Sequence, residues 1–170
     1  MDSEVSHLVE AWHWMYFETD LAFGGLAEPN VHRRPGPGLL SVSEHVAHVA
    51  RSEASIINRY LFGQPAEEWA DCLFREKLFG WPPTMLERPV HPELAQMSGK
   101  EVMDEYLLQH SRCYALAKTL TMRPDHVFSD DWERVKTLRD RLRIAAYHVA
   151  YHTGQIYSAR HALGEETPEN

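Results

Sequence analysis

The sequence predicts an all-α protein, an antiparallel four-helix bundle with a long crossover between the second and third helices. Four stretches carry apolar residues at three- and four-residue steps, the spacing that places side chains on one face of a helix. Runs rich in Pro and Gly separate these stretches, and no long segment alternates in the manner of a β-strand. Because 170 residues is the length of one ordinary domain, a single domain is expected over residues 1–170.

Local signals bound the first two helices. Large apolar residues recur at helical spacing over residues 5–26, and a loop rich in Pro and Gly follows. The second helix is expected from Ser41 or Ser43 to about residue 62. Ser41 and Glu44 have the spacing of a capping box, in which each side chain binds the other residue's backbone N–H.

A long connection at residues 63–99 separates the second helix from the third. It contains five prolines, although residues 66–79 have the pattern of a short helix. Connections of this length usually cover part of the protein or carry function.

The third and fourth helices also have recognisable ends. Ser98 and Glu101 have the spacing of another capping box, and the third helix is expected to continue to about residue 120. The fourth helix is expected over residues 132–163. It ends at Gly164, a residue suited to the left-handed cap at a helix C-terminus.

Composition and charge exclude several classes of protein. The formal net charge of −8 argues against binding to nucleic acid, which requires clustered Lys and Arg. Basic and acidic residues alternate at positions 134–143, a pattern typical of a solvated helix face. No apolar run reaches the ~18 residues needed to cross a membrane, so no membrane association is expected. Since Cys72 and Cys113 are too few for a disulfide framework, we expect a cytoplasmic protein.

Histidine is the unusual residue type, with 11 copies. His148 and His152 lie four residues apart, a spacing at which two neutral imidazoles on one helix face can bind a metal ion. Chance placement gives about 0.7 such pairs, so the spacing alone is weak evidence. A metal ion needs a third ligand from elsewhere, and both His45 and His48 on the second helix qualify.

Two segments resemble the motifs of a known family. SVSEHVAHVARSE, at residues 41–53, is similar to the second-helix motif of the DinB/YfiT-like family, and YHVAYHTGQI, at residues 147–156, is similar to its HxxxHRGQI element. The resemblance covers nearly the whole chain, including the long crossover. It implies a bound divalent metal ion, with zinc or nickel expected, whose ligands are His48, His148 and His152.

The resemblance also draws attention to three neighbouring positions. Glu53 falls on the family's acidic residue, where it is a candidate catalytic base, a partner that orients a ligand imidazole, or a carboxylate paired with a basic neighbour. Thr153 stands where the family usually has Arg, which bears on how the site is oriented and binds anions. His45 lies nearer the apolar face of its helix than His48 and competes with it as the third ligand.

The family that this chain resembles includes enzymes that add low-molecular-weight thiols, such as bacillithiol or mycothiol, to electrophiles. The resemblance therefore implies a metal-dependent thiol S-transferase in detoxification or stress response, with a small-molecule thiol and an electrophile as partners. One alternative is a metal-dependent hydrolase, in which water is the nucleophile. Another is a noncatalytic, stress-induced dimeric bundle, whose structural metal would need a fourth ligand such as His45, His110 or Cys113. A homodimer is expected as the commonest assembly.

Several aromatic residues are candidates for lining a substrate cleft, although core packing is the more frequent role of such residues. They are Trp12, Trp14, Tyr147 and Tyr151. The remaining histidines have no partner at convincing spacing and are expected on the surface or in loops. They are His7, His13, His32, His91, His126 and His161.

Overall fold

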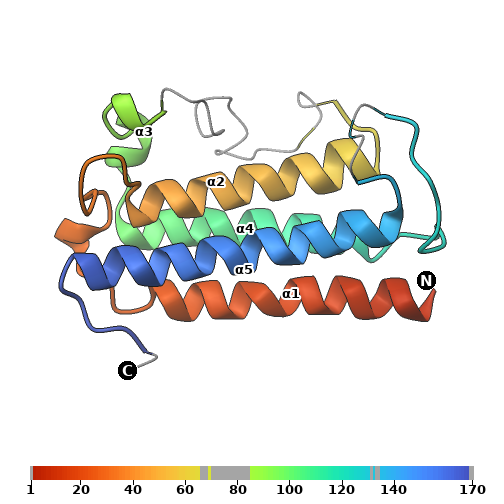
Figure 1. Cartoon of the computed structure of the whole chain (residues 1–170), viewed down its shortest axis with the longest axis horizontal. Coiled ribbons are helices and arrows are strands. Elements are labelled where there is room, and N and C mark those ends of the chain that lie inside the picture. The colour runs from red at the N-terminus through yellow and green to blue at the C-terminus, as the bar shows by residue number, and fades with distance from the viewer. Residues whose placement is uncertain (1, 66–68, 70–84, 131, 133–134, 169–170) are drawn as a thin grey trace.

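The computed structural model describes residues 2–65, 69, 85–130, 132 and 135–168 (Figure 1). Its long helices are α1 (Ser3–Phe23), α2 (Val42–Ala54), α4 (Gly99–Ala117) and α5 (Leu138–Ala162). Shorter helices are η1 (Glu28–Asn30), η2 (Ser55–Leu61), η6 (Met85–Glu87) and α3 (Pro92–Ala95). The described residues contain no strand, and the predicted all-α helical bundle is confirmed. The short helix expected at residues 66–79 and Cys72 lie outside the described residues.

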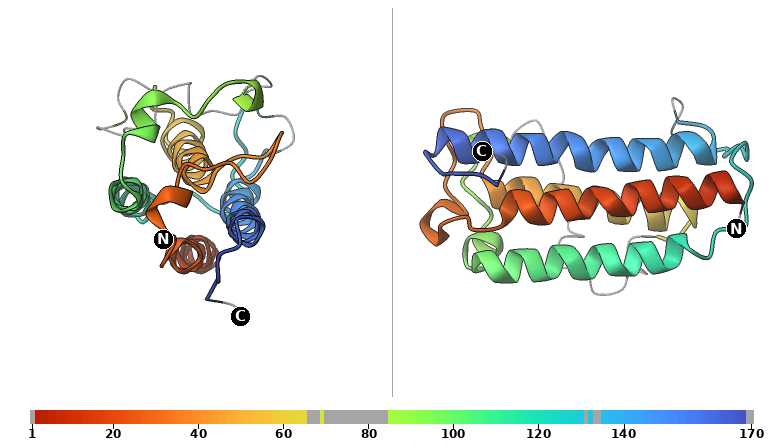
Figure 2. Two further views of the ribbon diagram at one scale, coloured as in Figure 1. Left: turned by 90° about the vertical axis from the view of Figure 1, so that its left-hand side faces the viewer. Right: turned by 90° about the horizontal axis from the view of Figure 1, so that it is seen from below.

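The four long helices pack in a square (Figure 2). Helix α1 lies beside α4 and α5, and α2 lies beside the same two helices, so α1 and α2 occupy opposite corners. The crossover returns the chain to the end of the bundle where α2 began, so α4 runs in the direction of α2 (Figure 1). The neighbouring pairs α2/α5 and α1/α4 are antiparallel.

Both predicted capping boxes are confirmed. Ser41 Oγ accepts a hydrogen bond from the backbone N–H of Glu44 at 3.3 Å, and the Glu44 carboxylate accepts one from the backbone N–H of Ser41 at 2.9 Å. Ser98 and Glu101 form the same reciprocal pair at the start of α4. Each box satisfies backbone N–H groups that have no partner within the helix, which fixes where the helix begins.

Helix α2 does not end at Ala54 but widens into η2, which has π-helical hydrogen bonding. The expected continuation of the second helix to about residue 62 is therefore right in length but not in geometry. π-Helical turns are rare and often occur at functional sites.

The fourth helix begins at Leu138, six residues after the predicted start at residue 132. Thr137 caps it, because its side-chain oxygen accepts a hydrogen bond from the backbone N–H of Asp140 at 3.1 Å. Thr137 also forms an isolated antiparallel bridge with Val127. In the sequence, apolar residues continue at helical spacing before Thr137, so the predicted start of the helix was too early.

Arg141 overturns the expectation of a solvated helix face at positions 134–143. Its side chain is fully buried, and its guanidinium donates hydrogen bonds to the backbone carbonyls of Val135, at 3.0 Å, and Tyr60. It also pairs with Asp130 at 2.6 Å and lies over the ring of Phe128, 3.8 Å from the centroid. Arg141 thus joins the end of η2, at Tyr60, to Asp130 and Val135 in the connection before α5.

The core between the helices is built mainly of aliphatic side chains from all four, with Trp12 and Tyr106 among the largest fully buried residues. Cys113 is also buried. None of the described helices combines the length and the apolar character that a bilayer crossing requires.

Replacing Arg141 tests its role as an anchor. Arg141→Met is expected to lower the free energy of unfolding by about 3 kcal/mol, because it leaves two buried carbonyls and Asp130 without their partner. Urea denaturation followed by circular dichroism measures the change. The control is Arg123→Met, which removes an exposed ion pair with Asp125 and is expected to cost less than about 0.5 kcal/mol. Equal effects of the two variants would contradict the anchoring role.

Candidate metal centre

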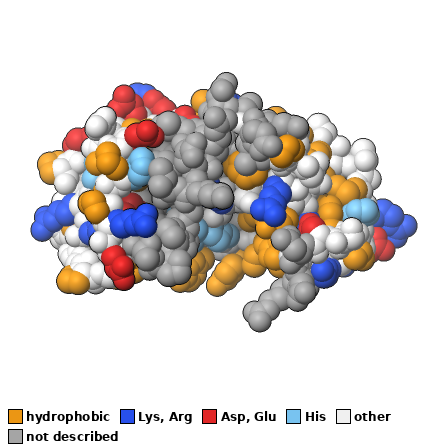
Figure 3. Space-filling model, turned by 90° about the horizontal axis from the view of Figure 1, so that it is seen from above, with side chains coloured by type: hydrophobic (Ala, Val, Ile, Leu, Met, Phe, Trp, Pro, Cys, Tyr) orange, Lys and Arg blue, Asp and Glu red, His pale blue; other side chains and the backbone are white. Residues whose placement is uncertain are grey.

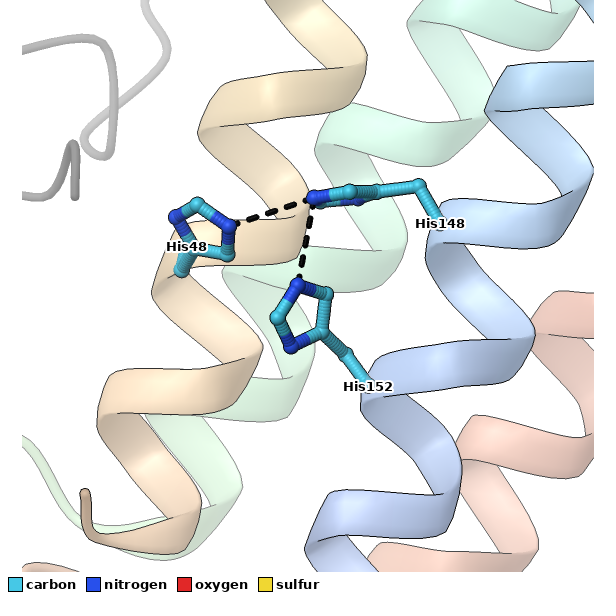
Figure 4. Close-up of side chains that lie close together, drawn as sticks. All are labelled: His48, His148 and His152. Atoms are coloured by element: carbon cyan, nitrogen blue, oxygen red, sulfur yellow. Dashed lines mark hydrogen bonds between the residues drawn. The ribbon is translucent and has the colours of Figure 1, made fainter. Parts of the chain in front are cut away.

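Three imidazoles from two helices meet between α2 and α5 (Figure 4). His48 comes from α2, whereas His148 and His152 lie one turn apart on α5. The Nε2 atom of His148 is 3.2 Å from Nε2 of His48 and 3.2 Å from Nε2 of His152. One ring nitrogen of each residue lies within 4.8 Å of the others.

The spacing of these nitrogens fits a shared cation. Ligand nitrogens at about 2.0–2.1 Å from a tetrahedral zinc ion lie about 3.3 Å apart, close to both short separations in the cluster. A neutral ring nitrogen that carries a proton can donate only one normal hydrogen bond, yet His148 Nε2 faces two other ring nitrogens. A single cation at a common point would accept the lone pairs of all three rings and account for both contacts.

The surroundings keep these imidazoles neutral. Burial lowers the pKa of His48 to about 2 and that of His148 to about 4, and the neighbouring imidazoles add to both effects. Burial also lowers the pKa of His152. Because a histidine must be unprotonated to bind a metal ion, the site is ready for a cation at neutral pH.

His48 rather than His45 completes the cluster. His45 is also buried, and burial lowers its pKa to about 4. Its ring centroid lies 5.7 Å from that of His152, whereas the rings of His48 and His152 are 4.7 Å apart. The structure therefore supports His48, the residue that the family motif indicates, over His45, which lies nearer the apolar face of its helix.

Thr153, which stands where the family motif usually has Arg, contacts helix α1. Its hydroxyl donates to the backbone carbonyl of Val149 at 2.9 Å and lies 2.7 Å from the hydroxyl of Thr19. Both threonine side chains are buried. This position therefore contributes to the contact between α5 and α1.

The carboxylate of Glu53 is buried, and Oε1 accepts a hydrogen bond from Nδ1 of His110 on α4 at 2.6 Å. Burial raises its pKa, and the bond from His110 opposes that rise. This contact agrees with the alternative in which Glu53 pairs with a basic neighbour. Its role as a base at the metal cluster stays a prediction.

The other fourth-ligand candidates have contacts away from the cluster. His110 bonds to Glu53, and the sulfur of Cys113 accepts a hydrogen bond from Gln109 at 3.0 Å. Among the residues that the structure describes, three side chains form the candidate metal cluster. Three protein ligands are the usual number in a catalytic zinc site, which leaves a position open.

Three of the histidines that have no partner at convincing sequence spacing make specific contacts in the structure. His13 Nδ1 is 2.7 Å from Nε2 of His110. His32 contacts the Ser43 hydroxyl at 2.9 Å and the Met97 carbonyl at 2.7 Å, and His161 contacts the Thr167 hydroxyl at 2.9 Å. His13 is exposed and His32 lies in a loop, as expected, but sequence spacing did not reveal their contacts with distant segments.

A pocket of about 310 Å³ opens beside the cluster, with His148 in its wall. Other lining residues are Arg51, Ser52, Ser55, Tyr60 and Trp132. On the face seen in Figure 3, histidine side chains reach the surface beside a group of hydrophobic side chains.

The aromatic residues expected to line a cleft have other positions. Trp12 is fully buried in the core, and Tyr147 and Tyr151 are exposed on α5. Tyr60 and Trp132 line the pocket beside His148 instead, and their ring centroids are 4.7 Å apart. Trp14 lines a different pocket, on α1.

Comparison with known proteins gives one match. A family model described as the DinB superfamily matches residues 11–156, a range that includes all three clustered histidines. Neither the curated proteins nor the solved structures provide a match.

Metal titration tests the cluster directly. Protein purified without a histidine tag is expected to bind one equivalent of Zn²⁺ or Ni²⁺ in isothermal titration calorimetry. His148→Ala is expected to weaken binding by more than about 100-fold, because it removes the central ligand. His45→Ala is the matched control and should change the affinity by less than about tenfold. A larger loss from His45→Ala than from His48→Ala would reverse the assignment of the third ligand.

The buried imidazoles also predict how stability depends on pH. The pKa values of His45, His48 and His148 in the folded protein lie below the ordinary 6.5, so the unfolded chain takes up protons first as the pH falls. Without metal, the free energy of unfolding is therefore expected to fall from pH 6.5 toward pH 4, by up to about 1.4 kcal/mol per pH unit for each histidine. Urea denaturation in EDTA at several pH values measures this slope.

His48→Leu is expected to reduce the slope, since it removes a histidine whose pKa is lowered by burial in the folded protein. The exposed His7 supplies the control, because His7→Leu should leave the slope unchanged. A slope that is the same in all three proteins would show that these imidazoles do not govern acid stability.

Proposed function

Since this chain belongs to the DinB superfamily, and since three buried imidazoles converge between two of its helices, we propose that it is a metal-dependent thiol S-transferase. Its substrates are a low-molecular-weight thiol and an electrophile. The observation that carries the proposal is a cluster of three histidines with a pocket directly beside it.

The donor set suits zinc or nickel, because neutral imidazole is a favourable ligand for both ions. A divalent cation held by His48, His148 and His152 would lower the pKa of a coordinating thiol from its ordinary value near ~8.5, so that thiolate is available at neutral pH. The chain's contribution is to present three unprotonated nitrogens from a buried site.

Both polar and aromatic side chains line the pocket. Arg51, with Ser52 and Ser55, offers a positive charge and two hydroxyl groups to an anionic or polar group on the thiol. Tyr60 and Trp132 offer aromatic surface to the electrophile. In the reaction, the thiol loses its proton to solvent, its sulfur forms a bond to the electrophilic carbon, and the leaving group departs with its electron pair.

Monochlorobimane tests the proposal, because replacement of its chloride by a thiol gives a fluorescent product. Protein loaded with Zn²⁺ or Ni²⁺ is expected to exceed the background rate with at least one of several thiols. Arg51→Ala is expected to raise KM for an anionic thiol by about tenfold with little change in kcat, because the charge serves binding. The control is Arg143→Ala, which removes an exposed positive charge from α5.

The outcomes separate the competing functions. Turnover of activated esters without thiol would replace the transferase by a hydrolase. Stoichiometric metal binding with neither activity, together with a dimer in light scattering, would favour the noncatalytic bundle.

A further inference from the structure

A second row of titratable side chains crosses the bundle from α2 to α1. Glu53 on α2 bonds to Nδ1 of His110 on α4 at 2.6 Å. Nε2 of His110 then lies 2.7 Å from Nδ1 of His13 on α1. Glu53 and His110 are buried, whereas His13 is exposed, so the row connects a buried carboxylate to the surface.

The carboxylate sets the direction of the hydrogen bonds along this row. When Glu53 is ionised it can only accept, so Nδ1 of His110 carries a proton and donates it. Nε2 of neutral His110 is then an acceptor, and Nδ1 of His13 must donate to it. This leaves the lone pair of His13 on Nε2, the nitrogen that is not used within the row.

Packing holds the two imidazoles in place. The ring of Tyr16 stacks on His110, with 3.4 Å between centroids, and the ring of Tyr114 stacks on His13 at 4.0 Å. Tyr114 is itself fixed by donating a hydrogen bond to Glu10 at 2.7 Å. Rings held in this way keep the alignment that proton transfer between them requires.

His13 and His110 line a pocket of about 370 Å³ between α1 and α4. Its other walls include Trp14, Phe17 and Leu107, and Asp20 lies at its edge. Trp14 is 60% exposed and Phe17 is 51% exposed, which is unusual for side chains of this size. The pocket therefore combines aromatic surface with a histidine whose lone pair is set by buried groups.

We propose that Glu53, His110 and His13 form a proton relay that deprotonates a small aromatic ligand with a weakly acidic hydroxyl in this pocket. Nε2 of His13 takes the hydroxyl proton, and Nδ1 of His13 releases its own proton to Nε2 of His110. Nδ1 of His110 releases its proton to the carboxylate of Glu53. The ligand becomes an anion, Glu53 becomes neutral, and both imidazoles end neutral.

The surroundings match each part of this step. Burial raises the pKa of Glu53, so the carboxylate is a better proton acceptor than an exposed one. Burial lowers the pKa of His13, with a further contribution from His110, so His13 is available as a base. Aromatic walls favour a planar ligand.

This site is distinct from the histidine cluster. The cluster lies between α2 and α5, whereas the pocket lies between α1 and α4, on the opposite side of the bundle (Figure 2). Helix α2 carries both His48 of the cluster and Glu53 of the row, but no residue of α2 lines the pocket. A ligand in this pocket therefore does not depend on a metal ion in the cluster.

The test uses 4-nitrophenol, whose anion is yellow and whose neutral form is nearly colourless. At a pH below the pKa of the free compound, the wild-type protein is expected to bind it and to increase its anion absorbance. Glu53→Gln is expected to retain binding within about threefold but to lose the absorbance increase, because the relay loses its proton acceptor. His13→Phe keeps the aromatic stack but is expected to weaken binding about tenfold, since one hydrogen bond is lost.

Two controls keep the result interpretable. His7→Phe changes an exposed histidine on the same helix, and His148→Ala disrupts the metal cluster, so neither should affect the absorbance increase. Ring ¹⁵N chemical shifts of the wild-type protein provide a readout that does not depend on any variant folding. They are expected to show His13 protonated at Nδ1. A proton on Nε2 of His13 at neutral pH, or an absorbance increase that survives Glu53→Gln, would overturn the proposal.

Discussion

The candidate metal centre depends on keeping three imidazoles unprotonated while they lie close together between two antiparallel helices. Protonation of one ring is disfavoured because the charge would be buried and would repel any charge on its neighbours. That electrostatic constraint makes the cluster a good cation site, because a divalent ion satisfies three lone pairs that hydrogen bonds cannot satisfy together. Ser41 fixes the start of α2, Thr137 fixes the start of α5, and Arg141 joins α5 to the end of η2, so the two helices that carry these rings are anchored.

Local chemistry made much of the fold predictable. The capping boxes at Ser41 and Ser98 fix helix starts through residues three positions apart, and such signals are visible in a sequence. The helix that begins at residue 138 was predicted to start too early because apolar periodicity alone does not mark where a helix begins. Arg141 was misplaced on the surface for a related reason, since its partners are backbone carbonyls that no sequence pattern marks.

The site was predictable only in part. His148 and His152 share a helix and could be paired from spacing, but the choice of His48 over His45 came from a motif and needed the helix packing to support it. The contacts of His110 join residues 57 and 97 positions away, so spacing rules carry no information about them. Glu53 was singled out by its match to the acidic residue of the family motif, yet it lies five positions from His48, about 140° around the helix, and bonds to His110 on α4.

The widened turn of η2 has a consequence for how this protein could diverge. Ser55 and Tyr60 in the pocket wall lie on η2, whereas His48 lies on regular α-helix before it. Each residue added to or removed from a helix rotates everything beyond it by about 100°. A single insertion or deletion early in η2 would therefore change which η2 side chains, such as Tyr60, face the pocket, while leaving His48 on α2 in register.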